Sequence, residues 1–421
     1  MVTIDEKIKV SKQKLGEKIA CVVEVLTPVH IGSGVKLAEG IDFIKTNYSV
    51  QIVSQAELMK HLEENHDEME RFIKGGYKLD LLRRIPEGKR YNISMGRTSE
   101  INEFEKNGNG KPYIPGSSIK GAIRTILLKK RFDKLSPVEQ NELLREINNN
   151  RKEWASEPII KRLLGNNSNQ NIMRILEVFD AEFNELELNK VLVLSLTNDQ
   201  GTSYGWKQLW GNRNNVSDPD KASHIFCETL PVNSKGYFSI SLQNFLMNNS
   251  EAKSVLNFSE TALESIGNLS EIINEYSKKK LENEKEFFNN LKSPKKLSSV
   301  ITEIDNLLEQ INNLNNDEFI LRISWGSGWK GMTGDYLNED WLNKFRKKYK
   351  LGKKDFPIFP KTRRIVFEDN KPKYLTGWVK VKLNEPKHIV QNNNSKLDER
   401  ESIDAMERLK QNFRVVETKK K

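Results

Sequence analysis

The segment best suited to binding an anion is residues 115–124 (PGSSIKGAIR). A Pro-Gly turn precedes Ser117 and Ser118, which predict the N-terminus of a helix with free backbone N–H groups and two hydroxyls. Lys120 and Arg124 are one helical turn apart, so both cations lie on the same helix face. The spacing GxxxxGK[ST] of a nucleotide-hydrolysing loop is absent. The segment therefore predicts a phosphate-binding site, and the alternative is an ordinary capped helix with solvated basic residues.

Two glycine-rich segments could bring the backbone close to a ligand. The first is residues 32–34 (GSG), and the second is residues 325–331 (WGSGWKG). Glycine permits close approach of the backbone, and Trp325 and Trp329 have rings that can stack on nucleic-acid bases. The alternative for each segment is a tight turn, with the tryptophans packed in the core.

Residues for acid–base or metal chemistry are few. The five histidines are scattered, with no HExxH sequence and no companion cluster of Cys, His or Asp, so neither a metal site nor a cofactor is expected. Only His30 adjoins a glycine segment. It could be a general base that deprotonates a ribose 2′-OH, and the alternative is a packed histidine at the end of a strand.

The positive charge of the chain is concentrated in one block. The formal net charge is +10, and residues 344–364 (KFRKKYKLGKKDFPIFPKTRR) hold ten basic residues and one acid. A solvated surface usually mixes both signs, so this unbalanced block favours a polyanionic partner over a solubility role. Whether the block contacts RNA or protein is left open.

The composition is typical of a soluble globular protein rather than a disordered one, with 37% hydrophobic and 30% charged residues. No stretch approaches the ~18 consecutive apolar residues that a membrane-spanning helix needs, and the first residues lack the apolar core of a signal peptide. Cys21 and Cys227 lie among β-forming residues, which favours two reduced, buried thiols. We therefore expect a cytoplasmic protein.

The elements that position these residues follow from hydrophobic periodicity. The first part predicts a strand at residues 19–29, a flexible loop at 30–34 around the first glycine segment, and a hairpin at 41–53 that turns at Asn47. A helix at 55–73, an irregular excursion at 75–111 and a second helix at 113–131 should follow. A helical insertion is then expected at residues 132–170, followed by strands at 175–183, 191–197, 223–230 and 237–242.

The rest of the chain predicts a helical hairpin and a second mixed segment. Residues 251–316 place Ile304, Leu308, Ile311 and Leu314 at heptad-like steps, which favours a hairpin packed on its own domain over a partner coiled coil. Strands are expected at 318–324, 364–368 and 375–383, with a helix at 338–349.

This order of elements predicts an α+β fold with two ferredoxin-like (RRM-like, split βαβ) domains and helical insertions. We expect an N-terminal domain at residues 1–245, with insertions near 75–111 and 132–170. A helical segment plus the second RRM-like domain should follow at 246–390, and a charged tail at 391–421.

Six motifs together resemble a known family. They are LTPVHIGSG at 26–34, PYIPGSSIKGAIRT at 112–125, ILEVFDAEF at 175–183, WGSGWKG at 325–331, FPKTRR at 359–364 and GWVKVKL at 377–383. This combination resembles RAMP-superfamily subunits of the type III-A CRISPR (Csm) effector complex, and most closely the kind that caps the complex at the 3′ end of the CRISPR RNA.

The resemblance implies a non-catalytic, RNA-binding role in antiviral defence. It implies contact with the 3′ portion of the CRISPR RNA, docking on the backbone subunit of the complex, and support for 3′-end maturation of the guide, with host nucleases recruited to trim it. Together with the basic block, the residues expected to face RNA are Gly32, Ser33, Gly34, Ser117, Ser118, Lys120, Arg124, Gly326, Gly328, Lys330, Lys361, Arg363 and Arg364.

Two other functions stay open at this point. A RAMP endoribonuclease that cleaves CRISPR repeat RNA would use His30 as its general base, although PGSSxKGxxR and PKTRR are not marks of that enzyme. A scaffold that touches only protein would leave the basic block unexplained. Neither the insertion at 132–170 nor the segment 251–316 carries a motif of the family, so their roles are unassigned.

Overall fold

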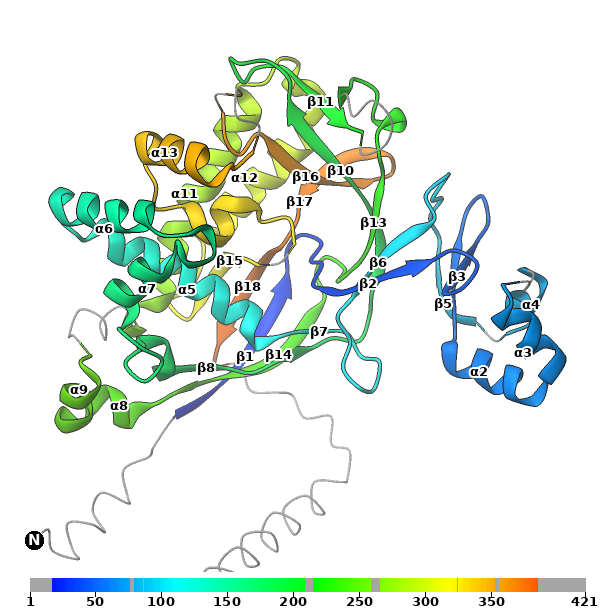
Figure 1. Cartoon of the computed structure of the whole chain (residues 1–421), viewed down its shortest axis with the longest axis horizontal. Coiled ribbons are helices and arrows are strands. Elements are labelled where there is room, and N and C mark those ends of the chain that lie inside the picture. The colour runs from blue at the N-terminus through cyan, green and yellow to red at the C-terminus, as the bar shows by residue number, and fades with distance from the viewer. Residues whose placement is uncertain are drawn as a thin grey trace, which may run out of the picture. The chain divides into compact units, whose positions relative to one another are not determined.

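The computed structural model describes residues 17–75, 79–85, 87–208, 215–258, 266–323, 325–352, 356 and 358–384. Its described residues form two large sheets, a small sheet and the helices that pack on them (Figure 1). The α+β prediction is confirmed. The expected tail at 391–421 lies outside the described residues.

The first sheet joins strands from both ends of the described chain. Its order is β15-β18-β1-β14-β9-β7, with β8 also paired to β14. The strands are β1 (Glu17–Val25), β7 (Tyr113–Ile114), β8 (Leu176–Val178), β9 (Ala181–Glu182), β14 (Lys235–Leu242), β15 (Glu318–Arg322) and β18 (Trp378–Leu383). All of these pairs are antiparallel, and Cys21 of β1 lies opposite Phe238 on one side and Leu383 on the other. The first and last strands of the described chain are therefore neighbours.

The second sheet also mixes early and late strands. Its order is β12-β11-β10-β13-β6-β2, with β16 paired to β10 and to β17. The strands are β2 (Gly32–Ala38), β6 (Glu100–Phe104), β10 (Glu187–Leu196), β11 (Tyr204–Lys207), β12 (Asn215–Val216), β13 (Ile225–Thr229), β16 (Thr362–Glu368) and β17 (Lys371–Leu375). All of the described residues belong to one compact unit. The boundary at residue 245 stays a prediction, and strands from both sides of it share each large sheet.

The predicted hairpin and the helix that follows it are confirmed. β3 (Phe43–Lys45) pairs with β4 (Val50–Val53), and α2 (Gln55–Glu64) and α3 (His66–Ile73) fill the expected helix with a break at Asn65. The expected irregular excursion at 75–111 is wrong. It contains α4 (Leu79–Arg84), β5 (Glu87–Tyr91) and β6, because both strands gain their order from partners distant in sequence.

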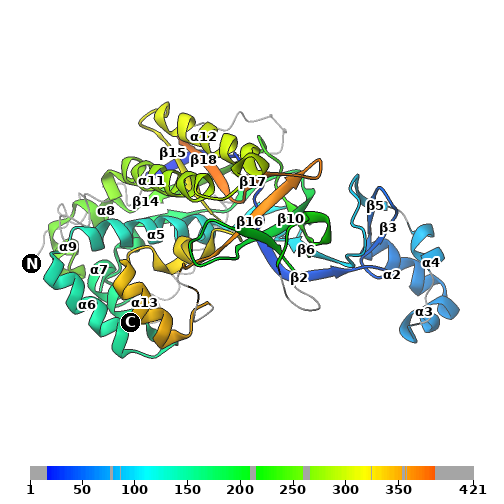
Figure 2. The same cartoon turned by 90° about the horizontal axis from the view of Figure 1, so that it is seen from above.

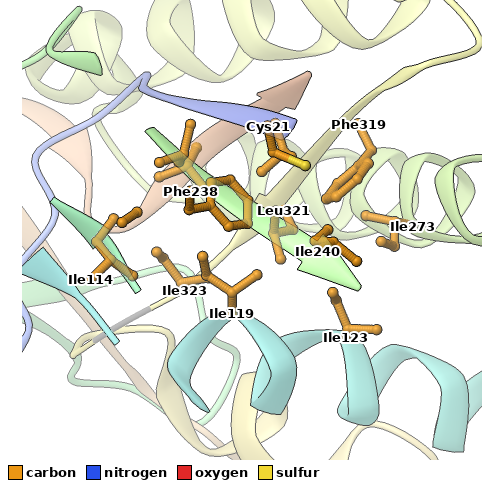
Figure 3. Close-up of a cluster of buried hydrophobic side chains, with 14 of the residues drawn as sticks. Cys21, Ile114, Ile119, Ile123, Phe238, Ile240, Ile273, Phe319, Leu321 and Ile323 are labelled. Carbon is orange, nitrogen blue, oxygen red and sulfur yellow. The ribbon is translucent and has the colours of Figure 1, made fainter. Parts of the chain in front are cut away.

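Helix α5 (Gly116–Asp133) packs on the first sheet, as its apolar spacing predicts. Ile119 and Ile123 of α5 are fully buried against strand residues that include Cys21 and Phe238 (Figure 3). The Cys227 thiol is buried too, and burial raises the pKa of each thiol to about 12. Two reduced, buried cysteines are therefore what the structure contains.

The helical insertion at 132–170 is confirmed and gains a structural role. Its helices α6 (Pro137–Asn149) and α7 (Glu157–Leu164), joined by η1 (Lys152–Trp154), share a core with α13 (Glu339–Tyr349) near the C-terminal end of the described chain (Figure 2). The Tyr349 hydroxyl donates to the Ile147 carbonyl at 2.6 Å, and Trp341 Nε1 donates to Asn141 Oδ1 at 3.0 Å. The insertion therefore supports α13, which carries the first part of the basic block.

The helical segment at 251–316 packs on its own chain, as predicted. After α8 (Asn244–Asn248) and α9 (Ser250–Leu256), α11 (Leu269–Asn289) and α12 (Ser298–Asn312) lie side by side, joined through η4 (Pro294–Leu297). Ile304 and Ile311 are buried. Helix α11 contributes Ile273 to the core under the first sheet and Phe288 to the core under the second. The segment therefore ties the two cores together.

Candidate nucleic-acid interface

The N-terminus of α5 is closed by the protein's own chain. The helix begins at Gly116, and the residue at the N-cap is Pro115, whose side chain makes no capping hydrogen bond. The predicted Ser117/Ser118 cap is therefore wrong. The Gly116 N–H donates to Asp180 Oδ1 at 2.7 Å, and the Ser118 N–H donates to the Pro115 carbonyl at 2.8 Å. A Cβ at Gly116 would lie 2.0 Å from the Val178 carbonyl oxygen. Gly116 therefore permits close packing, and Asp180 takes the place predicted for a phosphate.

Lys120 and Arg124 keep the properties expected of phosphate-binding residues. Both side chains are half-buried on α5, and burial lowers the pKa of each, with Glu177 partly offsetting the shift at Lys120. Neither makes an ion pair with an acidic residue of the described chain. Half-buried cations without an acidic partner favour an external anion.

The first glycine segment is not a flexible loop. Gly32, Ser33 and Gly34 begin β2, an edge strand that pairs with β6 through a bulge. The Ser33 hydroxyl donates to Glu103 Oε2 at 3.0 Å and accepts from the Val35 N–H at 3.1 Å. The segment is ordered by pairing, its glycines are exposed, and the Ser33 side chain is held by Glu103.

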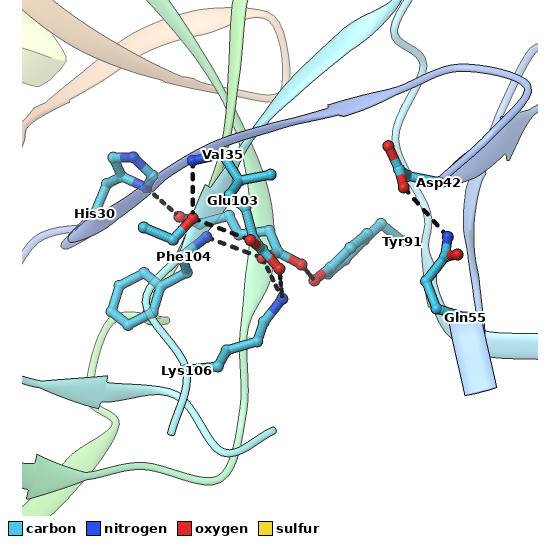
Figure 4. Close-up of polar contacts among 10 residues, drawn as sticks. His30, Val35, Asp42, Gln55, Tyr91, Glu103, Phe104 and Lys106 are labelled. Carbon is cyan, nitrogen blue, oxygen red and sulfur yellow. Dashed lines mark hydrogen bonds and ion pairs between the residues drawn. The ribbon is translucent and has the colours of Figure 1, made fainter. Parts of the chain in front are cut away.

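His30 packs in the interior behind this strand. The residue is 2% exposed, and its Nδ1 donates to the Glu228 carbonyl at 2.7 Å (Figure 4). The ring meets that of Trp325 edge-on at 5.6 Å between centroids. Burial lowers the pKa of His30. The neighbouring Glu228 carboxylate accepts from the Tyr91 hydroxyl at 2.8 Å and lies 2.9 Å from Lys106 Nζ. The packing alternative for His30 is therefore the observed one.

The second glycine segment is packed on the chain around it. Gly326 has φ +101°, and a Cβ there would lie 2.2 Å from Thr376 Oγ1, so both conformation and space require glycine. Trp329 meets the Phe359 ring at 5.2 Å, and the Arg364 guanidinium lies 4.3 Å from the Trp325 ring centre. Both tryptophans pack internally, which is the alternative to base stacking.

The basic block divides into internal arginines and exposed lysines. Arg363 Nε lies 2.6 Å from Glu284 Oε2 of α11, and the guanidinium of Arg363 stacks on Phe287 at 4.0 Å. Lys361 Nζ lies 4.4 Å from the Phe356 ring centre. The exposed cations of the described block are on and just after α13, at Lys344, Lys347, Lys348 and Lys350. Residues 353–355 and 357 of the block lie outside the described residues.

The α13 lysines were not among the individual residues predicted to face RNA. Their spacing along α13 was the available signal, since Lys344, Lys347 and Lys348 recur at three- and four-residue steps. No acidic side chain within the described ranges pairs with any of them. They form an exposed cationic face, called here the α13 lysine face.

A polar cavity of about 550 Å³ brings several predicted residues together. Helices α5 and α11, the second glycine segment and residues 358–363 line it, including Gly326, Gly328, Lys330 and Arg363. Lys280 and Asp335 form an ion pair at 2.5 Å across it. Arg322 and Arg363 lower the pKa of Glu284 although burial alone would raise it, and burial lowers the pKa of Arg322 to about 10.

The α11 members of this cavity carry no sequence motif. Lys280 and Glu284 look like ordinary charged positions of a helix, and only the fold sets them against Asp335 and Arg363. The predicted residues Gly32, Ser33 and Gly34 are on β2 and do not line this cavity.

Within the part of the chain that the structure describes, no group of three or more His, Cys, Asp or Glu residues is arranged to hold a metal ion. No described helix is both long and apolar enough to cross a membrane.

The chain belongs to the RAMP superfamily, whose sequence model matches residues 22–415. Over 35 residues it is 60% identical to the CRISPR system protein Csm5 of Streptococcus thermophilus, a match that covers 8% of this chain and 10% of that relative.

Two solved structures share the fold. One is a chain from the cryo-EM structure of a Csm–crRNA–target RNA ternary complex of a type III-A CRISPR-Cas system. It is 22% identical, with a TM-score of 0.59, and the match covers 87% of this chain and all of that one. The other is the crystal structure of T. onnurineus Csm5, which is 19% identical, with a TM-score of 0.55, over 85% of this chain and 99% of that one.

Proposed function

We propose that this chain is the Csm5-type subunit of a type III-A CRISPR effector complex, where it binds the 3′ portion of the CRISPR RNA and caps the backbone of the complex. The observation that carries the proposal is the 35-residue match at 60% identity to Csm5, within a chain whose fold matches Csm5 over 85% of its length. The cationic groups of the structure give this proposal its physical basis.

The RNA-contacting residues are drawn from the cations that have no acidic partner in the described structure. We assign this role to Lys120 and Arg124 on α5, Lys330 within the second glycine segment, and the α13 lysine face. Arg363, by contrast, acts as a structural residue through its ion pair with Glu284. Single-stranded RNA binds to such surfaces chiefly through its phosphates.

The subunit does not cleave RNA itself, and it supports maturation of the guide 3′ end by docking on the backbone subunit and recruiting host nucleases. It acts in the cytoplasm and in antiviral defence, without contact to a membrane. The burial of His30, the one candidate general base, supports a non-catalytic role.

The test is a double substitution of Lys120→Ala and Arg124→Ala in the assembled complex. We expect a loss of about 1–3 kcal/mol of guide-RNA binding for each charged hydrogen bond removed, with an unchanged melting temperature of the isolated subunit. The matched control is Lys74→Ala with Lys161→Ala, because both lysines are exposed and ion-paired within their own helical segments. Guide RNAs of normal 3′ length and yield from the Lys120/Arg124 variant would remove α5 from the interface.

A further inference from the structure

The charges that line the cavity between α5 and α11 balance, with four basic residues (Lys280, Arg322, Lys330 and Arg363) and four acidic ones (Glu284, Glu286, Asp335 and Glu339). Lys280 pairs with Asp335, and Glu284 pairs with Arg363. The Arg322 guanidinium donates to the Thr376 carbonyl at 2.8 Å and to the Gly326 carbonyl at 3.2 Å. Because these charges are engaged with partners inside the protein, the cavity is suited to a neutral polar ligand rather than to an isolated anion.

The uncharged part of the lining combines aromatic rings with hydrogen-bonding groups. The residues that supply these rings and groups are Thr125, Tyr276, Ser277, Asn283, Phe287, Asn290, Ser327, Thr362 and Trp378. Ser277 Oγ and Trp378 Nε1 are buried and have no hydrogen-bond partner among the described residues. Aromatic rings, among them Phe287 with the Arg363 guanidinium over one face at 4.0 Å, lie beside amide and hydroxyl groups. This combination matches a planar ring with donors and acceptors along its edge.

A second hollow of about 530 Å³ adjoins the cavity. The two share Ile126, Tyr276, Lys280, Asn283, Lys330 and Asp335. Lysines dominate the second hollow. Three of them pair with acids: Lys129 with Asp133, Lys130 with Glu275, and Lys280 with Asp335. Lys134, Lys279 and Lys330 have no ion pair with any described residue, so this hollow presents positive charge beside the neutral cavity.

We propose that one nucleotide of single-stranded RNA inserts its base into the cavity between α5 and α11, with the flanking phosphates against Lys134, Lys279 and Lys330. A base is neutral, planar and polar at its edge, so it suits the electrically balanced cavity. The phosphates that flank it are anionic, so they suit the cationic hollow that adjoins the cavity. This inference rests on the proposed RNA binding and adds a defined site to it.

The test uses the full-length protein and two 12-nucleotide RNAs, one intact and one in which the bases are absent from the central positions. Asn283 is exposed on α11 and lines both hollows, so Asn283→Trp should keep the base out of the cavity without disturbing the core. The matched control is Asn289→Trp, on the same helix and also exposed, but outside the lining of both hollows.

We expect the dissociation constant of the wild-type protein to rise about tenfold on loss of the bases, which is the scale of one base–aromatic stack. Asn283→Trp should weaken binding of the intact RNA by a similar factor and leave binding of the abasic RNA unchanged, whereas Asn289→Trp should match wild type. Equal binding of the two RNAs by the wild-type protein, or equal behaviour of the two tryptophan variants, would overturn the base pocket while leaving RNA binding intact. No binding of either RNA would instead contradict the proposed function.

A second measurement avoids substitutions altogether. RNA that carries 4-thiouridine should crosslink to Tyr276 or Phe287 of the wild-type protein, as mapped by mass spectrometry, because both residues line the cavity. Adenosine and uridine monophosphate should compete only weakly, since a free nucleotide lacks the neighbouring phosphates. Crosslinks confined to other surfaces would contradict the proposal, and strong competition by a free nucleotide would make the cavity a small-molecule site. Protection of Asn283→Cys from thiol reagents by another complex subunit, and not by RNA, would make it a protein-docking site.

Discussion

Arg363 and Arg364 follow one another in the chain, and both are held by other side chains of the protein. Arg363 pairs with Glu284 at 2.6 Å, with exposed fractions of only 16% and 17% for the two side chains, and Arg364 stacks on Trp325. Breaking a charge pair that is so little exposed to solvent lowers the stability of the fold, because the remaining charged partner stays buried without a counter-charge. These contacts of Arg363 and Arg364 stabilise the fold, and the expectation that the PKTRR sequence contacts RNA stays a prediction.

Replacing Arg363 by Ala should lower the free energy of unfolding by about 3–5 kcal/mol, since it leaves the Glu284 carboxylate without its partner. The measurement is chemical denaturation of the purified protein. As a control, Lys74→Ala breaks an exposed pair with Glu70 and should cost at most about 1 kcal/mol. An Arg363→Ala protein of normal stability but weaker RNA affinity would return this arginine to the interface.

His30 predicts a dependence of stability on pH. Burial holds its folded-state pKa below the ordinary value of 6.5, so the neutral ring is the form that fits the core. As the pH falls through 6.5, the unfolded chain takes up a proton that the folded chain does not, and stability is lost at up to about 1.4 kcal/mol per pH unit.

The variant His30→Asn keeps a donor near the Glu228 carbonyl and cannot titrate. Denaturation at pH 7.5 and pH 5.5 should therefore show a smaller loss of stability in this variant than in wild type. Identical losses would show that His30 is protonated as easily in the folded protein as in the unfolded chain.

At the scale of elements, local pattern predicted the helices well and their ends less well. The apolar spacing of Ile119, Ile123 and Leu127 was sufficient for α5, because those residues all face one core. The cap was missed because its acceptor, Asp180, is 64 residues away in sequence. The sequence does not predict strands β5 and β6 for the same reason. Their residues are largely polar, and the strands are ordered by pairing with strands that lie elsewhere in the sequence. The residues of α11 that line the cavity carry no sequence pattern that would predict a binding site.

The α13 lysine face gives a prediction about salt dependence. Replacing Lys344, Lys347 and Lys348 by Ala should reduce the slope of log K against log[salt] by about 0.7 for each phosphate that the variant no longer binds. Replacing Lys36, Lys74 and Lys161 by Ala changes the net charge equally but removes lysines already paired with acids, so the slope should stay as in wild type. Equal slopes for the two triple variants would make the α13 face a solubility or protein-docking surface.

At the scale of the whole molecule, the two ends of the described chain depend on each other. β1 lies between β14 and β18, and β10 pairs with β16, so residues 1–245 alone would lack two strands from each large sheet, β15 and β18 from the first and β16 and β17 from the second. A fragment of residues 1–245 should therefore aggregate or show no cooperative unfolding by circular dichroism, and co-expression with residues 246–421 should restore a soluble complex.

A control separates folding from chain connectivity. The full chain with a protease site inserted after Asn249, between α8 and α9, should remain assembled when it is cut after folding. A monomeric, cooperatively folded 1–245 fragment would instead establish two independent domains and contradict the shared-sheet account.

The order of strands could not be predicted from the sequence because a β-branched run identifies a strand without identifying its neighbour. Val22 and Val381 both read as strand residues, and only the fold sets β1 against β18. The family resemblance, by contrast, was carried by six short motifs, and the match of the RAMP superfamily to residues 22–415 confirms it.

The most direct test of the central claim is purification of the tagged full-length chain from its native host, with sequencing of the RNA that accompanies it. The account predicts repeat-derived CRISPR RNAs, together with the other subunits of a type III-A complex identified by mass spectrometry, and predicts that deleting the gene alters the 3′ ends of those RNAs. Recovery of the chain without CRISPR RNA, or unchanged guide 3′ ends in the deletion strain, would contradict it.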